Sequence, residues 1–129
     1  MFREMTEQEM KDIKWPTPIN VPQSGGSVRE ETMLCHFEMI DEDEYNDLAT
    51  QDDADRKIIR RVLKGWGKPK KGSGDPAIIE QGYYDNDGNH IDFSEDAVER
   101  LIKLPYARVS IINGYISMKF GNKSAARKN

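Results

Sequence analysis

The residues best spaced for metal chemistry are Asp85-Asn86-Asp87-Gly88, which resemble part of a calcium-binding loop. Such a loop has its glycine at the sixth position and needs carboxylates at the first and twelfth. With Gly88 placed sixth, Tyr83 falls at the first position and Ser94 at the twelfth, and neither is a carboxylate. A tight turn between two short strands explains the motif better than a calcium site.

The other candidates for metal binding or nucleophilic catalysis are His36, His90 and Cys35. Cys35 and His36 are neighbours in a predicted strand, so their side chains point to opposite faces. They cannot hold one metal ion together, and the histidine cannot act as a base for the thiol. We expect Cys35 to be a small core residue.

The carboxylates and glycines lack the context of an enzyme site. Most acids stand at expected helix starts or turns, and no apolar cleft is predicted around a pair of them. The glycine-rich stretches 24–27 and 71–74 lack the spacing of a phosphate-binding loop. The sequence therefore favours a binding protein over an enzyme, with no catalytic, cofactor-binding or metal-binding residues.

Composition points to one small intracellular domain. A chain of 129 residues can bury a modest core without disulfides, and its single cysteine fits a reducing compartment. Residues 1–14 lack the apolar segment of a signal peptide, and no run approaches the roughly 20 apolar residues of a membrane span. We expect a cytosolic protein that does not contact a membrane.

The charges are unevenly distributed. Residues 41–55 carry eight acids and no base, whereas bases gather at 56–61, 68–71 and 119–129. Solvated helix faces explain this pattern more simply than a dedicated partner site. The net charge of −4 argues against a nucleic-acid-binding domain. A small regulatory or nucleic-acid-binding protein that uses the basic patches stays an alternative, and it predicts steeply salt-sensitive binding.

We expect an α+β fold: a mainly α-helical domain with an N-terminal β-hairpin and a short second hairpin before the last two helices. Residues 1–14 are expected to be a charged arm, 15–120 the single domain and 121–129 a basic flexible tail. The first hairpin pairs residues 15–23 with 28–40 around a glycine turn. Pro16, Pro18 and Pro22 make its first strand an edge strand, where missing amide donors are tolerated.

Capping residues and hydrophobic spacing predict four helices in the domain. Asp41 caps a short first helix, and the second runs from Asp52 or Asp53 to Gly65-Trp66-Gly67, where the glycines end it. The second hairpin forms around the turn at residues 85–89. Ser94 then caps a helix that Pro105 closes, and a final helix covers 106–120.

The final helix has more apolar surface than a small core normally needs. One stripe consists of Val109, Ile112, Ile116 and Phe120, and a second of Ile111, Tyr115 and Met118. Either the helix is buried nearly all round, or one stripe is exposed for a partner. Our hypothesis for the partner-binding surface is the second stripe, Ile111, Tyr115 and Met118.

Short motifs occur here in an order that resembles the tail assembly chaperones of long-tailed bacteriophages, the siphophage type. The N-terminal half has Trp15, an apolar-x-apolar-Pro segment at 19–22, a glycine turn, Phe37, an acidic helix and a basic helix ending in Gly65-Trp66. The C-terminal half has the Asp85–Gly88 turn, Ile91-Asp92-Phe93-Ser94-Glu95, Leu101-Ile102-Lys103-Leu104-Pro105, Tyr115 and a basic end at Lys128-Asn129. The segment 68–82 is longer than the corresponding link in the family, which leaves its structure open.

This resemblance implies a non-virion protein of the infected host cytoplasm that binds and solubilises the tape measure protein. It also implies recruitment of tail tube subunits and assembly into a homo-oligomer of helical or spiral form. The alternative is a structural or tail-completion component of the phage virion, which would remain in the particle. The apolar stripes and charged exterior suit a protein that holds an aggregation-prone helical client through displaceable contacts.

Overall fold

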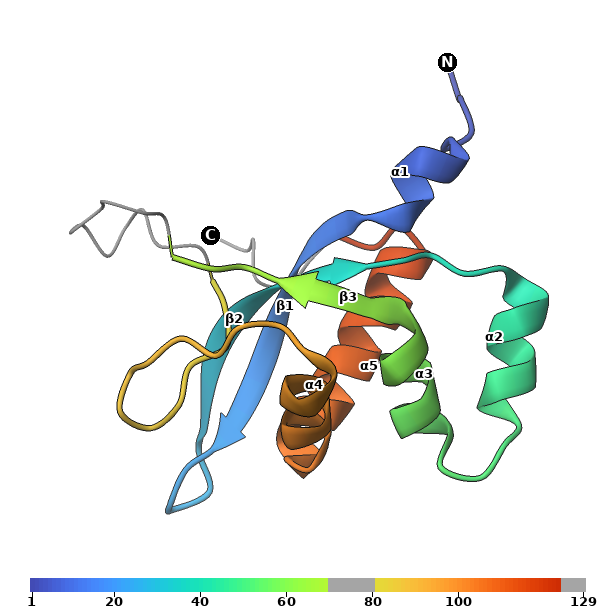
Figure 1. The fold of residues 1–129 in the computed structure, drawn as a ribbon. Helices are drawn as coiled ribbons and strands as arrows, with labels where there is room; N and C mark the ends of the chain where they lie inside the picture. The colour runs from blue at the N-terminus through green and yellow to red at the C-terminus, as the bar shows by residue number, and fades with distance from the viewer. Residues whose placement is uncertain (70–80, 124–129) are drawn as a thin grey trace.

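The computed structural model describes residues 1–69 and 81–123. Within these residues an antiparallel sheet of order β1-β2-β3 packs against a group of helices (Figure 1). The strands are β1 (Ile13–Pro22), β2 (Val28–Phe37) and β3 (Leu63–Trp66), and the helices are α1 (Glu7–Lys11), α2 (Glu42–Ala49), α3 (Ala54–Val62), α4 (Glu95–Ile102) and α5 (Pro105–Lys119). No helix in the described ranges is long and apolar enough to cross a membrane.

The β1–β2 hairpin extends past the ends of α4 and α5 (Figure 1). Gly25 and Gly26 turn the chain with φ angles of 91° and 90°, a region that glycine enters without the steric cost of a side chain. On β2, Met33, Cys35 and Phe37 are buried against the helices. The far half of the hairpin lies beyond this core, so its residues are more exposed.

The last helix packs closely on the first strand. Thr17 of β1 is fully buried beside Gly114 of α5, where an added Cβ would lie 2.5 Å from the Thr17 methyl group. The Asn20 amide donates to Ser110 Oγ at 3.1 Å. Gly114 therefore permits a close approach of helix and strand that a larger residue would prevent.

The predicted architecture is wrong about residues 63–66. The second helix of the domain ends at Val62 and does not continue to Gly65-Trp66-Gly67. Leu63 takes an extended conformation, and the chain pairs with β2 as β3, with Trp66 opposite Cys35. Both Leu63 and Trp66 are buried in this arrangement. The sheet is therefore three-stranded, because β2 offers a backbone edge that sequence periodicity does not reveal.

The predicted second hairpin is also wrong. Tyr84 and His90 form an isolated bridge, and no strand is found on either side of the turn in the described residues. The turn itself is present: Asp85 Oδ1 accepts from the amides of Asp87 and Asn89, each at 2.9 Å. These hydrogen bonds hold the pKa of Asp85 below its usual value. The flanking segments are too short for a ladder, and Tyr83 packs on Trp66 instead.

Several helix boundaries agree with the sequence predictions. Asp41 caps α2 through the Asp43 amide, and Ser94 caps α4 through the Ala97 amide at 3.0 Å. Pro105 differs from its predicted role, because it is the first residue of α5 and not the end of α4. In the arm, Thr6 and Glu9 form a capping box at the start of α1, which has no buried residue.

Candidate functional site

The predicted partner-binding stripe lies in the core. Ile111, Tyr115 and Met118 are only 1%, 1% and 3% exposed, so the expectation that they form a surface stripe is wrong. The large exposed hydrophobic residues here belong to the other stripe: Val109 of α5 is 49% exposed, and Phe120, directly after α5, is 66% exposed. Both stripes have helical spacing, and only the position of α5 against β1 and α3 decides which one is covered.

Tyr115 has a structural role in this core. Its ring meets Phe37 edge-on at 5.4 Å and stacks on Tyr45 at 5.9 Å. Its hydroxyl accepts from the Ile40 amide at 3.2 Å, and burial raises its pKa. The residue thus joins α5 to the segment that leads into α2.

A groove with a volume of about 540 Å³ lies between α3 and α4. Its lining combines the apolar residues Leu63, Phe93 and Val98 with five charged residues. The charged lining residues are Arg60, Lys64, Glu95, Asp96 and Glu99. A lining of apolar and charged side chains suits a protein segment better than a small polar substrate.

Phe93 lines this groove and is 39% exposed. Its ring meets Trp66 edge-on at 4.9 Å. Trp66 is itself fixed, because its indole N–H donates to the Ile91 carbonyl at 2.9 Å. The exposed phenyl ring therefore stands on a rigid aromatic support, as the anchor residues of protein interfaces commonly do.

An ion pair spans the groove between the two helices. Arg60 donates from Nε and Nη2 to the two carboxylate oxygens of Glu99, at 2.7 and 2.8 Å. This contact lowers the pKa of Glu99 and raises that of Arg60. Both side chains are nearly half exposed, so the pair fixes the spacing of α3 and α4 more than it stabilises the fold.

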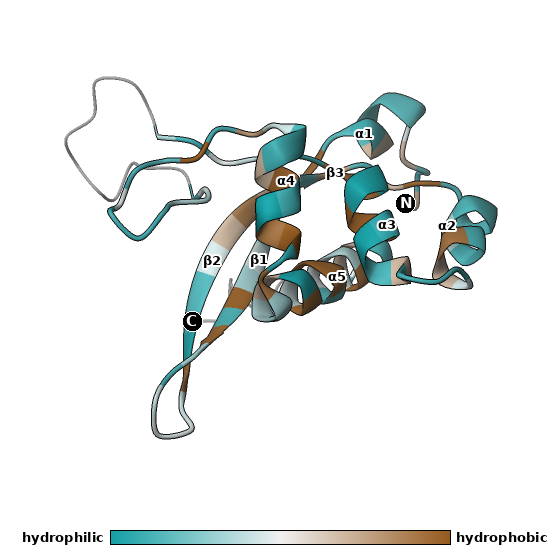
Figure 2. Cartoon of the chain, turned by 60° about the horizontal axis from the view of Figure 1, so that its bottom comes forward, coloured by the Kyte–Doolittle hydropathy of each residue, from teal (hydrophilic) through white to brown (hydrophobic). Residues whose placement is uncertain are grey.

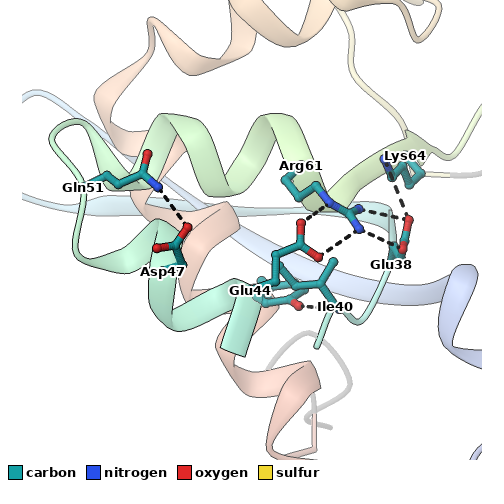
Figure 3. Close-up of polar contacts among 8 residues, drawn as sticks. Glu38, Ile40, Glu44, Asp47, Gln51, Arg61 and Lys64 are labelled. Carbon is teal, nitrogen blue, oxygen red and sulfur yellow. Dashed lines mark hydrogen bonds and ion pairs between the residues drawn. The ribbon is translucent and has the colours of Figure 1, made fainter. Parts of the chain in front are cut away.

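A second polar cluster attaches α2 to the body. Arg61 of α3 lies between Glu44 of α2 and Glu38, with Nε–Oε2 and Nη1–Oε1 distances of 2.6 and 3.2 Å, respectively (Figure 3). Lys64 also approaches Glu38, at 3.8 Å. Each cation has a carboxylate partner, so we interpret the cluster as a structural link between α2, α3 and the segment that contains Glu38.

No metal or nucleophile site emerges in the described ranges. They hold no group of three or more His, Cys, Asp or Glu residues that could bind a metal ion. Cys35 is fully buried, and burial raises its pKa to about 12, which leaves the thiol protonated and unreactive. His90 Nδ1 lies 3.2 Å from Asp92 and Nε2 lies 3.1 Å from the Gly67 carbonyl.

Sequence reasoning missed the groove, although one signal was present. Phe93 comes immediately before the cap residue Ser94, and Val98 is the fourth residue of the helix. This is the spacing of a hydrophobic staple. That spacing places the two side chains together at the start of α4. Nothing in the sequence places Leu63 beside them, because β3 was not predicted.

Comparison with known proteins adds no relative. No family model matches the chain, and no curated protein and no solved structure matches it either.

Proposed function

We propose that this chain is a phage tail assembly chaperone that binds and solubilises the tape measure protein in the host cell cytoplasm. It would act as a homo-oligomer and release its client as tail tube subunits assemble. The order of motifs from Trp15 to Asn129 supports the family, and the groove between α3 and α4 is the observation that carries the binding function.

The groove has the properties that a helical client requires. Leu63, Phe93 and Val98 form the apolar strip of the lining, and Phe93 is its exposed residue, because Leu63 and Val98 are only 2% and 5% exposed. A partner helix can place an apolar side chain against Phe93. Acids on the α4 side and bases on the α3 side set the orientation of charged residues beside that strip. Contacts of this limited extent are reversible, as a chaperone that must be displaced needs.

The arginines of α3 weigh against the nucleic-acid alternative. Arg56 pairs with Asp53, Arg60 with Glu99, and Arg61 with Glu38 and Glu44. The basic patch at 56–61 is therefore largely neutralised by neighbouring carboxylates. Binding to phosphate groups would require breaking these pairs.

The direct test is co-expression with the tape measure protein of the same phage. We expect the wild-type chain to increase the soluble fraction of the client and to comigrate with it on size-exclusion chromatography with light scattering. Phe93→Glu should abolish this effect, because it places a charge on the apolar strip. Phe120→Glu is the matched control: it changes another exposed phenylalanine, outside the groove, and should leave solubilisation intact.

The outcomes separate function from site. A wild-type chain without effect on client solubility would end the chaperone proposal and favour the virion component, to be sought in purified particles. Equal activity of Phe93→Glu and wild type would leave the function standing and move the binding site elsewhere. Circular dichroism of both variants checks that the fold is retained.

A further inference from the structure

The two long strands of the sheet have very different outer edges. Along a strand, successive residues direct their backbone N–H and C=O groups to opposite sides. On β1 the Asn20 amide donates to Ser110, away from β2, so the even-numbered residues point outward. Pro16, Pro18 and Pro22 occupy the same outward row and have no N–H group to offer. The outer edge of β1 is therefore closed to another strand.

On β2 no described residue pairs with the outer edge over part of its length, and this part is the open edge. Leu34 points away from β1, because its amide donates to the Gln81 carbonyl at 2.7 Å and its carbonyl accepts from Gly67 at 2.9 Å. The pairing with β3 extends only to Cys35. Glu30 and Thr32 continue the same outward row, and no backbone hydrogen bond in the described ranges engages them. This row is the kind of edge to which an extended peptide adds.

A hollow of about 170 Å³ lies next to this part of β2, and its lining also includes Ile19 and Val21 of β1 and Leu101, Leu104 and Ala107. Thr32 and Met33 of β2 contribute to it, and so do Tyr83, Tyr84 and Tyr106. Because Met33 faces the helices, the alternate residues of a strand added next to β2 would also face the hollow. Tyrosines give a large contact surface with few rotatable bonds, which suits the recognition of such side chains.

The charge of the edge indicates its occupant. Glu31 pairs with Arg29 at 2.7 Å, whereas Glu30 has no ion pair in the described residues. A second copy of this chain is a poor occupant of the edge. Antiparallel pairing of two β2 strands centred on Glu30 or Glu31 would place that glutamate opposite the same glutamate of the other copy, and the like charges would repel. A basic residue opposite Glu30 would be favourable instead.

We propose that the outer edge of β2 at residues 28–32 binds an extended, basic segment of another protein as an added strand. Apolar residues at alternate positions of that segment face the hollow lined by the tyrosines. This surface is distinct from the groove between α3 and α4, and the proposal does not depend on the chaperone function.

The test uses the full chain, labelled with ¹⁵N, and a synthetic decapeptide of alternating lysine and valine. A second decapeptide of the same sequence carries N-methyl groups on alternate amides, so it retains the side chains and cannot form a strand ladder. We expect the unmodified peptide to slow hydrogen exchange at the Glu30 and Thr32 amides. The methylated peptide should bind at least about tenfold more weakly, because it loses two or more backbone hydrogen bonds.

Two variants sharpen the test. Thr32→Pro removes an N–H group that points to the outer edge of β2. Thr32 stands opposite Pro18 in a pair that makes no hydrogen bond between β1 and β2, so the hairpin loses no such bond. The variant should bind the peptide about tenfold more weakly. Glu30→Lys leaves the backbone unchanged and should weaken binding severalfold at low salt, which keeps the test valid if the proline variant fails to fold. Unchanged exchange at Glu30 and Thr32, or equal binding of the two peptides, would overturn the proposal.

Discussion

Helices α5 and α2 both lie against α3, but they are held by different forces. α5 buries residues along its whole length. In Figure 2, α5 is more hydrophobic in colour than α2, which is mainly hydrophilic. α2 has no buried residue. It is attached through Glu44 to Arg61, through the stacking of Tyr45 on Tyr115, and through Lys119, whose Nζ lies 3.3 Å from the centre of the Tyr45 ring.

This difference predicts two levels of stability in one small domain. Burial of apolar side chains stabilises a fold far more than partly exposed ion pairs, each of which contributes about 0–1 kcal/mol. α5 should therefore open only when the whole domain unfolds. α2 should open locally, at a lower free energy, and expose the ring of Tyr115 when it does.

The largest effect is expected from charges placed on the buried face of α5. Ile111→Glu combined with Met118→Glu should unfold the domain, since each uncompensated buried charge costs about 3–5 kcal/mol of a total stability of about 5–15 kcal/mol. The matched control, Val109→Glu with Phe120→Glu, changes exposed residues of the same helix and of its C-terminal cap, and it should alter stability by about 0.5 kcal/mol or less. Urea unfolding followed by circular dichroism compares the two, and a folded Ile111/Met118 variant would contradict the assignment of faces.

A smaller loss of stability is expected from Gly114→Ala. The added methyl group would lie 2.5 Å from Thr17 Cγ2 and 3.0 Å from Thr17 Oγ1, so helix and strand must separate. Overpacking of this kind costs about 1–3 kcal/mol. Thr17→Ser removes the facing methyl group and retains the hydroxyl that donates to the Trp15 carbonyl. Thermal unfolding should therefore show that the double variant recovers part of the loss; a purely additive result would place the strain elsewhere.

The smallest global effect is expected from Arg61→Ala, which removes the link to α2. The free energy of unfolding should fall by about 1 kcal/mol, the upper end of the range for ion pairs that are partly exposed, as these are. Amides of α2 should nevertheless exchange faster with solvent, because local opening becomes easier. Arg56→Ala is the control, since its Asp53 partner lies outside α2. Equal protection of α2 in both variants would show that packing, and not charge, holds this helix.

Lowering the pH should weaken the ion pairs of Arg61. The hydrogen bond from Arg61 holds the pKa of Glu38 below its ordinary value of 4.5. A carboxyl group with a lowered pKa in the folded state contributes its full stabilisation above that ordinary value, and loses it as the pH falls through the lowered pKa. An NMR titration of Glu38 should therefore show a higher pKa in Arg61→Ala than in the wild type.

Local chemistry made part of this fold predictable. The caps at Asp41 and Ser94 and the glycine turn of the hairpin are short-range signals that operate within a few residues. The strand β3 was not predictable in the same way, because Leu63 and Trp66 become strand residues only through the edge of β2. The exposed side of α5 depends on contacts between residues 17 and 114, which no local pattern encodes.

The candidate site, too, was predictable only in its local part. Phe93 and Val98 could be placed together from their staple spacing at the start of α4. The third apolar component, Leu63, comes from a segment about 30 residues earlier in the chain, and it joins them only when the sheet forms. The open edge of β2 likewise depends on where β3 stops, although the closed edge of β1 could be predicted from its prolines.

The packing of α5 on β1 also bears on synthesis at the ribosome. Thr17 is among the first residues of the domain to be made and Gly114 among the last, so the emerging chain cannot cover the inner face of β1 until α5 has left the exit tunnel. During that interval β1 and β2 expose the apolar side chains that the finished domain buries. Ribosomal stalling or premature termination before residue 105 would therefore release an aggregation-prone fragment, which cellular proteases would be expected to remove.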